Sequence, residues 1–350
     1  MDFGLVSLPV LALTALFGYA VFFDTSAVVF QDIDVPPSVQ QLGYSPKVMS
    51  SRLANEVRMI DQKARTVKDI RDFALPGDES AVNALGDYFK FGEPIKATQQ
   101  LLGLVHYNFT GDVVKQGDDL KLSIRGSAHD RDQPFNTAAI GKDPEKLVHE
   151  AALDIVRFID PYIVASYAYE AARDGDKNYT TALREVRYCL VNMPKKELHW
   201  AYNLHGLILV QQGKLDDAME RYNAALALKP DFVLTVYNVG NLMLEKKQYD
   251  QAIAKYKETL KVDVKLVRTP QAYTQWGVAL TRQGQTDAAI PLFEKAIALN
   301  PQYADAYYRL GMAYKEKGKI KDAQEMIQRA VDRAPDRKDY AADLAPQLTN

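Results

Sequence analysis

The sequence contains very little cysteine and almost no excess of charge. Its single cysteine, Cys189, excludes an intramolecular disulfide and a cysteine-rich zinc site. The 43 basic and 45 acidic residues leave a formal net charge of −2, which gives no support for nucleic-acid binding. The 5 histidines show no metal-ligand spacing, and no phosphate-binding glycine loop or nucleophile motif is present. The sequence therefore predicts no enzyme, no cofactor and no metal site.

Charged residues are also missing between Phe3 and Phe23. A helix of this length spans about 30 Å, which is the thickness of the bilayer hydrocarbon. Aromatic residues lie at both ends of the stretch, as expected at membrane interfaces. Residues 1–24 are therefore predicted to form a single transmembrane anchor. The alternative is a cleaved signal peptide with a weak cleavage site at Gly18–Ala20, although no basic residue precedes the apolar run.

The patterns in residues 25–160 predict a small α/β domain. Leu120, Leu122 and Ile124 alternate with polar residues, which is the period of a half-buried strand. Ser45 followed by Pro46 is a typical helix start. The expected elements are a strand over 26–34, helices over 45–66 and 80–102, a hairpin around Gly117–Asp119 and a helix over 143–159.

Three short stretches of this domain, "FQDIDVP", the helix after "LGYSP" and "TGDVVKQGDDLKLSIRG", carry a weak resemblance. The domain resembles the amino-terminal domain of TolB-like and FlgO-like bacterial envelope proteins. Together with the predicted span, this resemblance implies a single-pass protein of the bacterial inner membrane. Few charges flank the span, so its orientation is poorly specified. We expect the body on the periplasmic side.

The second half of the chain contains an internal repeat. Gly206, Gly240, Gly277 and Gly311 recur at intervals of 34, 37 and 34 residues. Alanine stands twelve residues after each glycine, and a large side chain stands sixteen residues after it. Glycine and alanine allow two helices to approach closely, and proline ends three of the four second helices. The pattern therefore predicts successive pairs of antiparallel helices, with a longer connection before the third pair.

The repeat strongly resembles the tetratricopeptide repeat. The resemblance implies a mainly α protein with a carboxyl-terminal α-solenoid: about five repeats over residues 161–335, followed by a capping helix over 336–350. The first repeat is degenerate and is marked by Ala182, Cys189 and Pro194. Cys189 stands where other copies have Ala or Thr, which favours a small buried side chain.

The resemblance also implies a concave face that binds a protein or peptide. Family geometry places these residues on it: Trp200, Asn203, Leu207, Tyr237, Asn238, Asn241, Thr274, Gln275, Tyr308, Arg309 and Met312. Deeper positions add Thr281, Arg282, Lys315 and Glu316. Chaperone-binding members grip a carboxyl terminus through lysine and asparagine at set positions. Only Asn238, Asn241 and Arg309 match that set, so this clamp is not favoured.

Taken together, the sequence predicts a membrane-anchored scaffold that binds a protein partner on its concave face or assembles a membrane complex. In the second case the partner is another membrane protein. The alternative from another class is a soluble secreted or periplasmic protein. In that alternative the α/β domain binds a ligand and the repeats are an accessory. The mature amino terminus distinguishes the two, because cleavage after Ala20 would remove the anchor.

Overall fold

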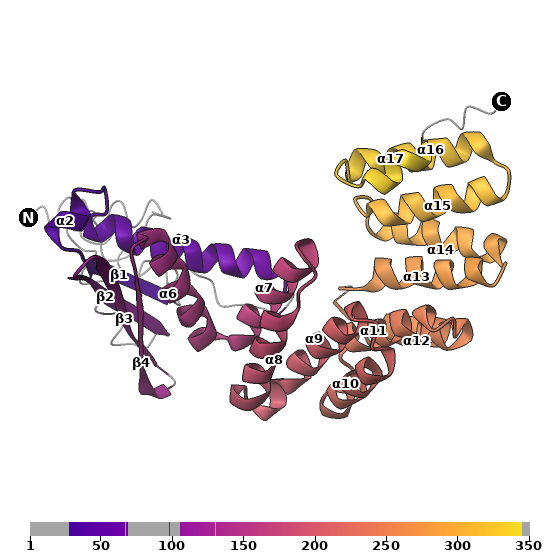
Figure 1. The fold of residues 1–350 in the computed structure, drawn as a ribbon. Coiled ribbons are helices and arrows are strands. Elements are labelled where there is room, and N and C mark those ends of the chain that lie inside the picture. Colours follow the sequence, from indigo (N-terminus) through magenta and orange to yellow (C-terminus); the bar gives the residue numbers. More distant parts are fainter. Residues whose placement is uncertain are drawn as a thin grey trace, which may run out of the picture. The chain divides into compact units, whose positions relative to one another are not determined.

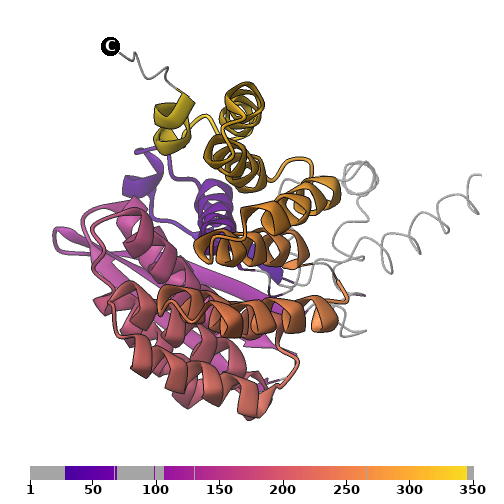
Figure 2. The same ribbon diagram turned by 90° about the vertical axis from the view of Figure 1, so that its right-hand side faces the viewer.

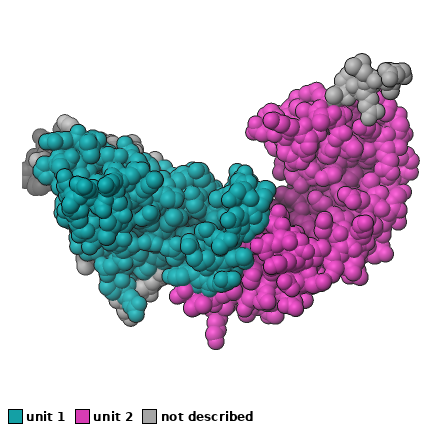
Figure 3. All heavy atoms as spheres, viewed as in Figure 1, with its two compact units in different colours: residues 1–188 teal, residues 189–350 magenta. Residues whose placement is uncertain are grey.

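The computed structural model describes residues 28–66, 68, 98, 106–129, 131–265 and 267–344. The chain divides into two compact units, residues 1–188 (unit 1) and residues 189–350 (unit 2), which are coloured separately in Figure 3. The predicted transmembrane span at 3–23 lies outside the described residues, as does almost all of the helix predicted over 80–102. Among the helices in the described ranges, none combines the length and the apolar character needed to cross a bilayer.

Unit 1 is built on a four-stranded mixed sheet with strand order β1-β2-β3-β4 (Figure 1). The strands are β1 (Val28–Asp34), β2 (Tyr107–Gln116), β3 (Asp119–Ala128) and β4 (Arg131–Gly141). β1 and β2 are parallel, and the other two pairs are antiparallel. The predicted hairpin is confirmed, and it turns at Gly117, whose φ of 63° suits glycine.

Helices α3 (Pro46–Ala64) and α6 (Pro144–Ile159) pack on the sheet (Figure 1), and a short helix α2 (Pro37–Gln40) precedes them. Both predicted starts are confirmed. Ser45 Oγ accepts a hydrogen bond from the backbone N–H of Val48 at 3.3 Å. Asp143 Oδ1 accepts one from Glu145 N at 3.0 Å. Apolar side chains from the helices and the sheet form one buried core.

Strand β4 was not predicted. Pro134 lies inside it, and proline has no backbone N–H to donate to a neighbouring strand. The strand tolerates Pro134 because β4 is an outer member of the sheet, with only β3 beside it in the strand order. A proline inside a short alternating run argues against a central strand, and this is why the sequence pattern did not predict a strand here.

The helices of the degenerate first copy, α7 (Pro161–Asp174) and α8 (Thr180–Asn192), fall largely within unit 1, which ends at Tyr188. Helix α7 packs against α3, and Ser166 Oγ donates a buried hydrogen bond to the carbonyl of Ala64 at 2.9 Å. The sequence placed the domain boundary at residue 160. The compact unit extends further because α7 buries one face on the α/β core. Cys189 is fully buried, as its place in the repeat pattern favoured.

Unit 2 consists of stacked helix pairs (Figures 1 and 2). A short 3₁₀ turn, Lys195–Glu197, precedes them. The first helices of the pairs are α9 (Leu198–Gln211), α11 (Val233–Glu245), α13 (Thr269–Arg282) and α15 (Ala304–Glu316). The second helices are α10 (Leu215–Leu228), α12 (Tyr249–Val262), α14 (Thr286–Leu299) and α16 (Ile320–Arg333). Helix α17 (Lys338–Leu344) follows, within the range predicted for the cap.

The glycine repeat permits close packing inside each pair. A β-carbon added to Gly206 would lie 2.4 Å from the ring of Tyr222, and one added to Gly277 would lie 2.5 Å from Phe293. Real side chains do not approach so closely, so glycine is needed where the ring of the second helix presses on the first. The same distance for Gly240 and Tyr256 is 2.6 Å. Glycine and ring therefore form one packing unit that recurs along the array.

The three extra residues before the third pair form a connection that is closed by Asp263. Its carboxylate is 3% exposed and accepts hydrogen bonds from Val267 N at 2.8 Å, from Arg268 N at 2.6 Å and from Thr269 Oγ1 at 2.9 Å. These donors belong to the loop and to the first turn of α13. The longer connection predicted from the sequence is therefore present, and one buried carboxylate fixes it.

Candidate functional site

The first helices lie on the inner side of the curve of unit 2. Consecutive first helices contact one another along the row α9, α11, α13 and α15. Consecutive second helices have at most slight contact among the described residues. A row whose members lie closer together must be on the inside of a bend, and Figure 3 shows unit 2 hollowed on one side. This inner row carries the residues that the sequence placed on a partner-binding face.

Two of the predicted face residues are buried in the packing of the helices. Asn203 is 2% exposed, and its Oδ1 accepts hydrogen bonds from Thr235 Oγ1 at 3.0 Å and from Asn238 Nδ2 at 2.9 Å. Thr274 is 0% exposed, and its hydroxyl donates to the carbonyl of Pro270 at 2.9 Å. Asn203 therefore joins α9 to α11 as an interior polar group. Neither side chain lies open to a partner.

Three further members of the predicted face are half-buried and hold internal contacts. Asn238 is the donor to Asn203, and Asn241 Oδ1 accepts from the hydroxyl of Tyr256 at 3.0 Å. Tyr308 donates to Asp343 Oδ2 of helix α17 at 2.7 Å. The Tyr340 ring also stacks on Tyr308 with ring centres 4.4 Å apart. Substitutions at these positions would disturb packing as well as any binding.

Tyr237 and Trp200 lie at the edges of the aromatic packing. Trp200 meets Phe232 edge-on, with ring centres 4.8 Å apart. The Tyr237 ring lies 6.0 Å from the ring of Tyr256, and the guanidinium of Arg268 lies 5.9 Å from its centre. Burial raises the pKa of Tyr237 to about 12, although a hydrogen bond with Asn241 and the nearby charge of Arg268 act in the opposite direction.

Tyr237 is therefore expected to ionise near pH 12, well above the ordinary tyrosine value of 10.0. Because the folded-state pKa is raised, the stability that neutral Tyr237 contributes is complete below pH 10 and is lost as the pH rises through about 12. Tyrosinate absorbance of the full chain minus that of a Tyr237→Phe variant should show a midpoint near pH 12. A midpoint near the ordinary value of 10.0 would contradict the burial of this hydroxyl.

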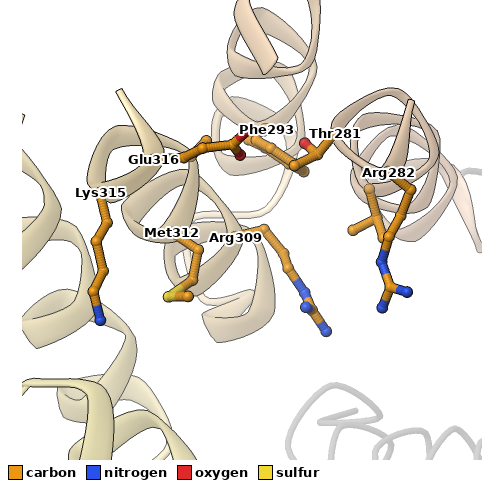
Figure 4. A pocket seen from close by; sticks show the side chains of 9 residues that line it. Thr281, Arg282, Phe293, Arg309, Met312, Lys315 and Glu316 are labelled. Atoms are coloured by element: carbon orange, nitrogen blue, oxygen red, sulfur yellow. The ribbon is translucent and has the colours of Figure 1, made fainter. Parts of the chain in front are cut away.

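The remaining members of the predicted face, Leu207, Gln275, Arg309 and Met312, are half-buried. Arg309 and Met312 line a pocket of about 400 Å³ between α13 and α15 (Figure 4). The rest of its lining comes mainly from the deeper positions that the sequence also assigned to the face. The complete lining is Val278, Thr281, Arg282, Phe293, Arg309, Met312, Ala313, Lys315 and Glu316.

Phe293 and Ala313 are the two lining residues that were not predicted on the face, and Phe293 is the larger. Phe293 belongs to the second helix α14, is buried, and packs under Gly277. The glycine at 277 is the sequence signal that could have revealed it, because a missing β-carbon lets the ring reach through to the inner row. The pocket therefore combines an apolar floor with a rim of three cationic side chains, Arg282, Arg309 and Lys315.

Within the described ranges, no group of three or more histidine, cysteine, aspartate or glutamate side chains lies close enough together to hold a metal ion. Asp160 illustrates the pattern, because its carboxylate caps Tyr162 N at 3.0 Å and pairs with Lys68. Charged clusters in unit 1 join helices to one another.

Comparison with known proteins identifies the repeat. Tetratricopeptide repeat models match residues 206–247 and 280–345. The chain is 31% identical over 146 residues to the probable UDP-N-acetylglucosamine–peptide N-acetylglucosaminyltransferase SPINDLY of Arabidopsis thaliana, which covers 41% of this chain and 16% of the relative. It is 33% identical over 93 residues to the small glutamine-rich tetratricopeptide repeat-containing protein 2 of Saccharomyces cerevisiae, covering 27% and 26%. The chain thus spans only a minor part of these relatives.

A third relative is matched over nearly its whole length. The uncharacterized protein MJ0572 of Methanocaldococcus jannaschii is 32% identical over 79 residues, which are 22% of this chain and 92% of the relative. Among solved structures, the Cut9–Hcn1 hetero-tetramer of the APC/C aligns with a TM-score of 0.49 and 17% identity, covering 57% of this chain and 39% of that one. The repeat spacing, the helix pairs and the two matches to repeat models establish that the chain is a tetratricopeptide repeat protein, with a small mixed-sheet α/β region ahead of its helical array.

Proposed function

We propose that the chain is a scaffold that holds a segment of a partner protein along the first helices of unit 2. The observation that carries this proposal is the open pocket between α13 and α15, lined by positions that the repeat assigns to its inner face. A pocket of about 400 Å³ has the size of ordinary ligand sites. It lies among the half-buried side chains that the first helices present on their inner side. A peptide laid along this row would bury them.

The row offers contact area that is not already used by the fold. Gln275 and Leu207 stand on α13 and α9, and neither is needed for a hydrogen bond of the kind that ties Asn203 and Asn241. Half-buried side chains of this type gain apolar burial when a partner covers them, at a small cost in lost freedom. The face therefore supports recognition of an extended segment over several repeats.

We also propose that residues 1–24 anchor the scaffold in a membrane, with the rest of the chain on the periplasmic side. The support is the uncharged run between Phe3 and Phe23, which is long enough for a helix across the bilayer. Anchoring would raise the effective concentration of unit 2 for partners at the same membrane. Extraction with carbonate tests this part: the full chain should stay with the membrane pellet, and release into the supernatant would contradict it.

A photo-crosslinking amino acid placed at single positions tests the binding face. We expect crosslinks to a partner from Leu207 and Gln275 on the first helices. No crosslink above background is expected from Gln251 and Gln328, which are exposed on the second helices α12 and α16. Crosslinked products are detected by a shift in gel mobility and identified by mass spectrometry. Equal crosslinking from both helix rows, or crosslinking from the second helices alone, would contradict the proposal.

A further inference from the structure

We infer that the pocket between α13 and α15 takes an internal segment of the partner in which a large apolar side chain stands between two acidic side chains. The inference rests on the proposed function and adds the chemistry of the bound segment. It is carried by the order of the side chains on α15 and by the charge of the pocket rim.

Helix α15 presents a cationic, an apolar and a second cationic side chain in line. Arg309, Met312 and Lys315 are spaced by three residues, so each lies about 4.5 Å further along the axis and about 60° around it, and the two cations flank Met312. In Figure 4, Met312 stands between Lys315 and Arg309, and Arg282 of α13 lies beyond Arg309. The charged ends of all three point to the same side of the pocket.

The three cationic groups are only loosely engaged within the protein. Arg282 has no ion pair with any residue that the structure describes, and its side chain is exposed. Arg309 Nε is buried without a hydrogen-bond partner among the described groups, and Asp305 Oδ1 lies 3.4 Å from it. Lys315 Nζ is 3.6 Å from Asp343 Oδ1. Carboxylates from a partner could improve on each of these contacts, and bidentate pairing with arginine is the strongest of them.

The charge of the rim favours an acidic segment. Arg282, Arg309 and Lys315 contribute three positive charges to the lining, and Glu316 is the single acidic side chain in it. A basic segment would meet like charges at three of these four positions. A neutral segment would cover Arg282 without giving it a carboxylate and would leave Arg309 and Lys315 with only their contacts to Asp305 and Asp343. Complementary charge therefore selects an acidic partner over the other two kinds.

The apolar floor of the pocket is the reason why we infer an apolar residue between the two acidic residues of the bound segment. Val278 and Phe293 are buried, and Met312 adds a flexible side chain that adapts to different shapes. The volume of about 400 Å³ accommodates one large aliphatic or aromatic side chain together with neighbouring backbone. Burial of such a side chain supplies the non-directional part of the affinity.

The arrangement also favours an internal segment over a chain terminus. The cationic groups stand on both sides of Met312, and Arg309 and Lys315 are separated by about 9 Å along the helix axis. A terminal carboxylate brings one charge at one point. In an extended polyproline II segment, two acidic residues on either side of an apolar one lie about 6 Å apart and project to its two sides, and the long arginine and lysine side chains cover the difference.

Selection from a peptide library tests the inference with the full chain in mild detergent. The probe is a library of random heptapeptides displayed between glycine-serine flanks on both sides, so that no peptide has a free terminus. We expect enrichment of peptides with an apolar residue between two acidic ones. The chosen peptide should bind at least about tenfold more weakly when both acids become glutamine, which is about 1.4 kcal/mol.

The matched variants separate local charge from total charge. Arg282→Gln/Lys315→Gln is expected to lose the enrichment and to weaken the chosen peptide about tenfold or more. Lys261→Gln/Lys321→Gln removes the same charge from exposed positions on α12 and α16 and should leave both unchanged. Circular dichroism controls for folding. Enrichment of non-acidic peptides, no enrichment over the Arg282→Gln/Lys315→Gln variant, or equal weakening by both double variants would overturn the inference.

Failure of this inference can be told apart from failure of the proposed function. Crosslinks from Leu207 and Gln275 without acidic enrichment would mean that a partner binds the face through other chemistry. A variant probe with glutamine in place of both acids and a free carboxyl terminus tests the other source of carboxylate. Binding of this probe in place of the internal acidic peptide would also overturn the inference while leaving the scaffold proposal intact.

Discussion

Replacing Tyr256 by alanine is expected to lower the free energy of unfolding by about 3–5 kcal/mol, which is the range for removing a large buried ring. Tyr256 is 0% exposed and fills the space left by Gly240, where an added β-carbon would lie 2.6 Å from the ring. Tyr256 also belongs to the same buried cluster as Ala272 in the first turn of α13, at the start of the next pair. Alanine would therefore leave a cavity both within a repeat and at its junction with the next one. Urea unfolding of the full chain, followed by circular dichroism, measures the loss.

Tyr256→Phe is the matched control. Phenylalanine keeps the ring and removes only the hydroxyl, which donates to Asn241 Oδ1 at 3.0 Å. We expect a loss of about 1 kcal/mol from this variant, the usual net value of one hydrogen bond. If the alanine variant were as stable as the phenylalanine variant, the ring would not be the element that holds neighbouring repeats together.

Replacing Asp263 by alanine is expected to lower the free energy of unfolding by about 2–4 kcal/mol. The carboxylate accepts three hydrogen bonds, and bonds to a charged group are worth about 1.5–3 kcal/mol each, although losses at one site do not add fully. The variant leaves Val267 N, Arg268 N and Thr269 Oγ1 without their acceptor. Urea unfolding measures the loss, and limited proteolysis should show faster cleavage in the connection over 263–268.

Asp231→Ala serves as the control for Asp263. Asp231 is exposed in the connection between the first two pairs, so its removal changes the net charge by the same amount without affecting a buried bond. We expect a change of at most about 0.5 kcal/mol, as for other surface positions. Similar losses from both variants would show that general charge, and not the three hydrogen bonds, explains the effect.

The fold of unit 2 was predictable because its signals are periodic. The glycines at 206, 240, 277 and 311 mark positions where no side chain fits, and the same register recurs in each pair. The residues that fix individual turns and connections were harder to predict. Asp263 looks like any surface acid in the sequence, and Lys247, with a φ of 59°, adopts the left-handed conformation that glycine adopts in the other pairs. Strand β4 was missed because Pro134 obscures its pattern.

The candidate site was predictable in outline, since family geometry assigns the inner row of helices. Family geometry does not reveal which of these side chains form hydrogen bonds or packing contacts within the protein. Asn203 and Thr274 occupy face positions of the repeat but are buried. Each forms a hydrogen bond within the packed helices and does not point outward. Tyr308 donates a hydrogen bond to Asp343 and stacks on Tyr340. Both partners lie on helix α17, which is outside the repeat pattern. Such pairings depend on three-dimensional neighbours that one sequence does not reveal.

The most direct test of the account is a methyl NMR spectrum of the full chain labelled at its 8 methionines. The spectrum is recorded with and without a peptide from the crosslinked partner, and each signal is assigned by substitution with leucine. We predict that the Met312 methyl shifts on binding, while those of Met219 and Met326 on the second helices keep their positions. Shifts at Met219 or Met326 with an unchanged Met312 would place the partner on the opposite row and contradict binding along the inner face.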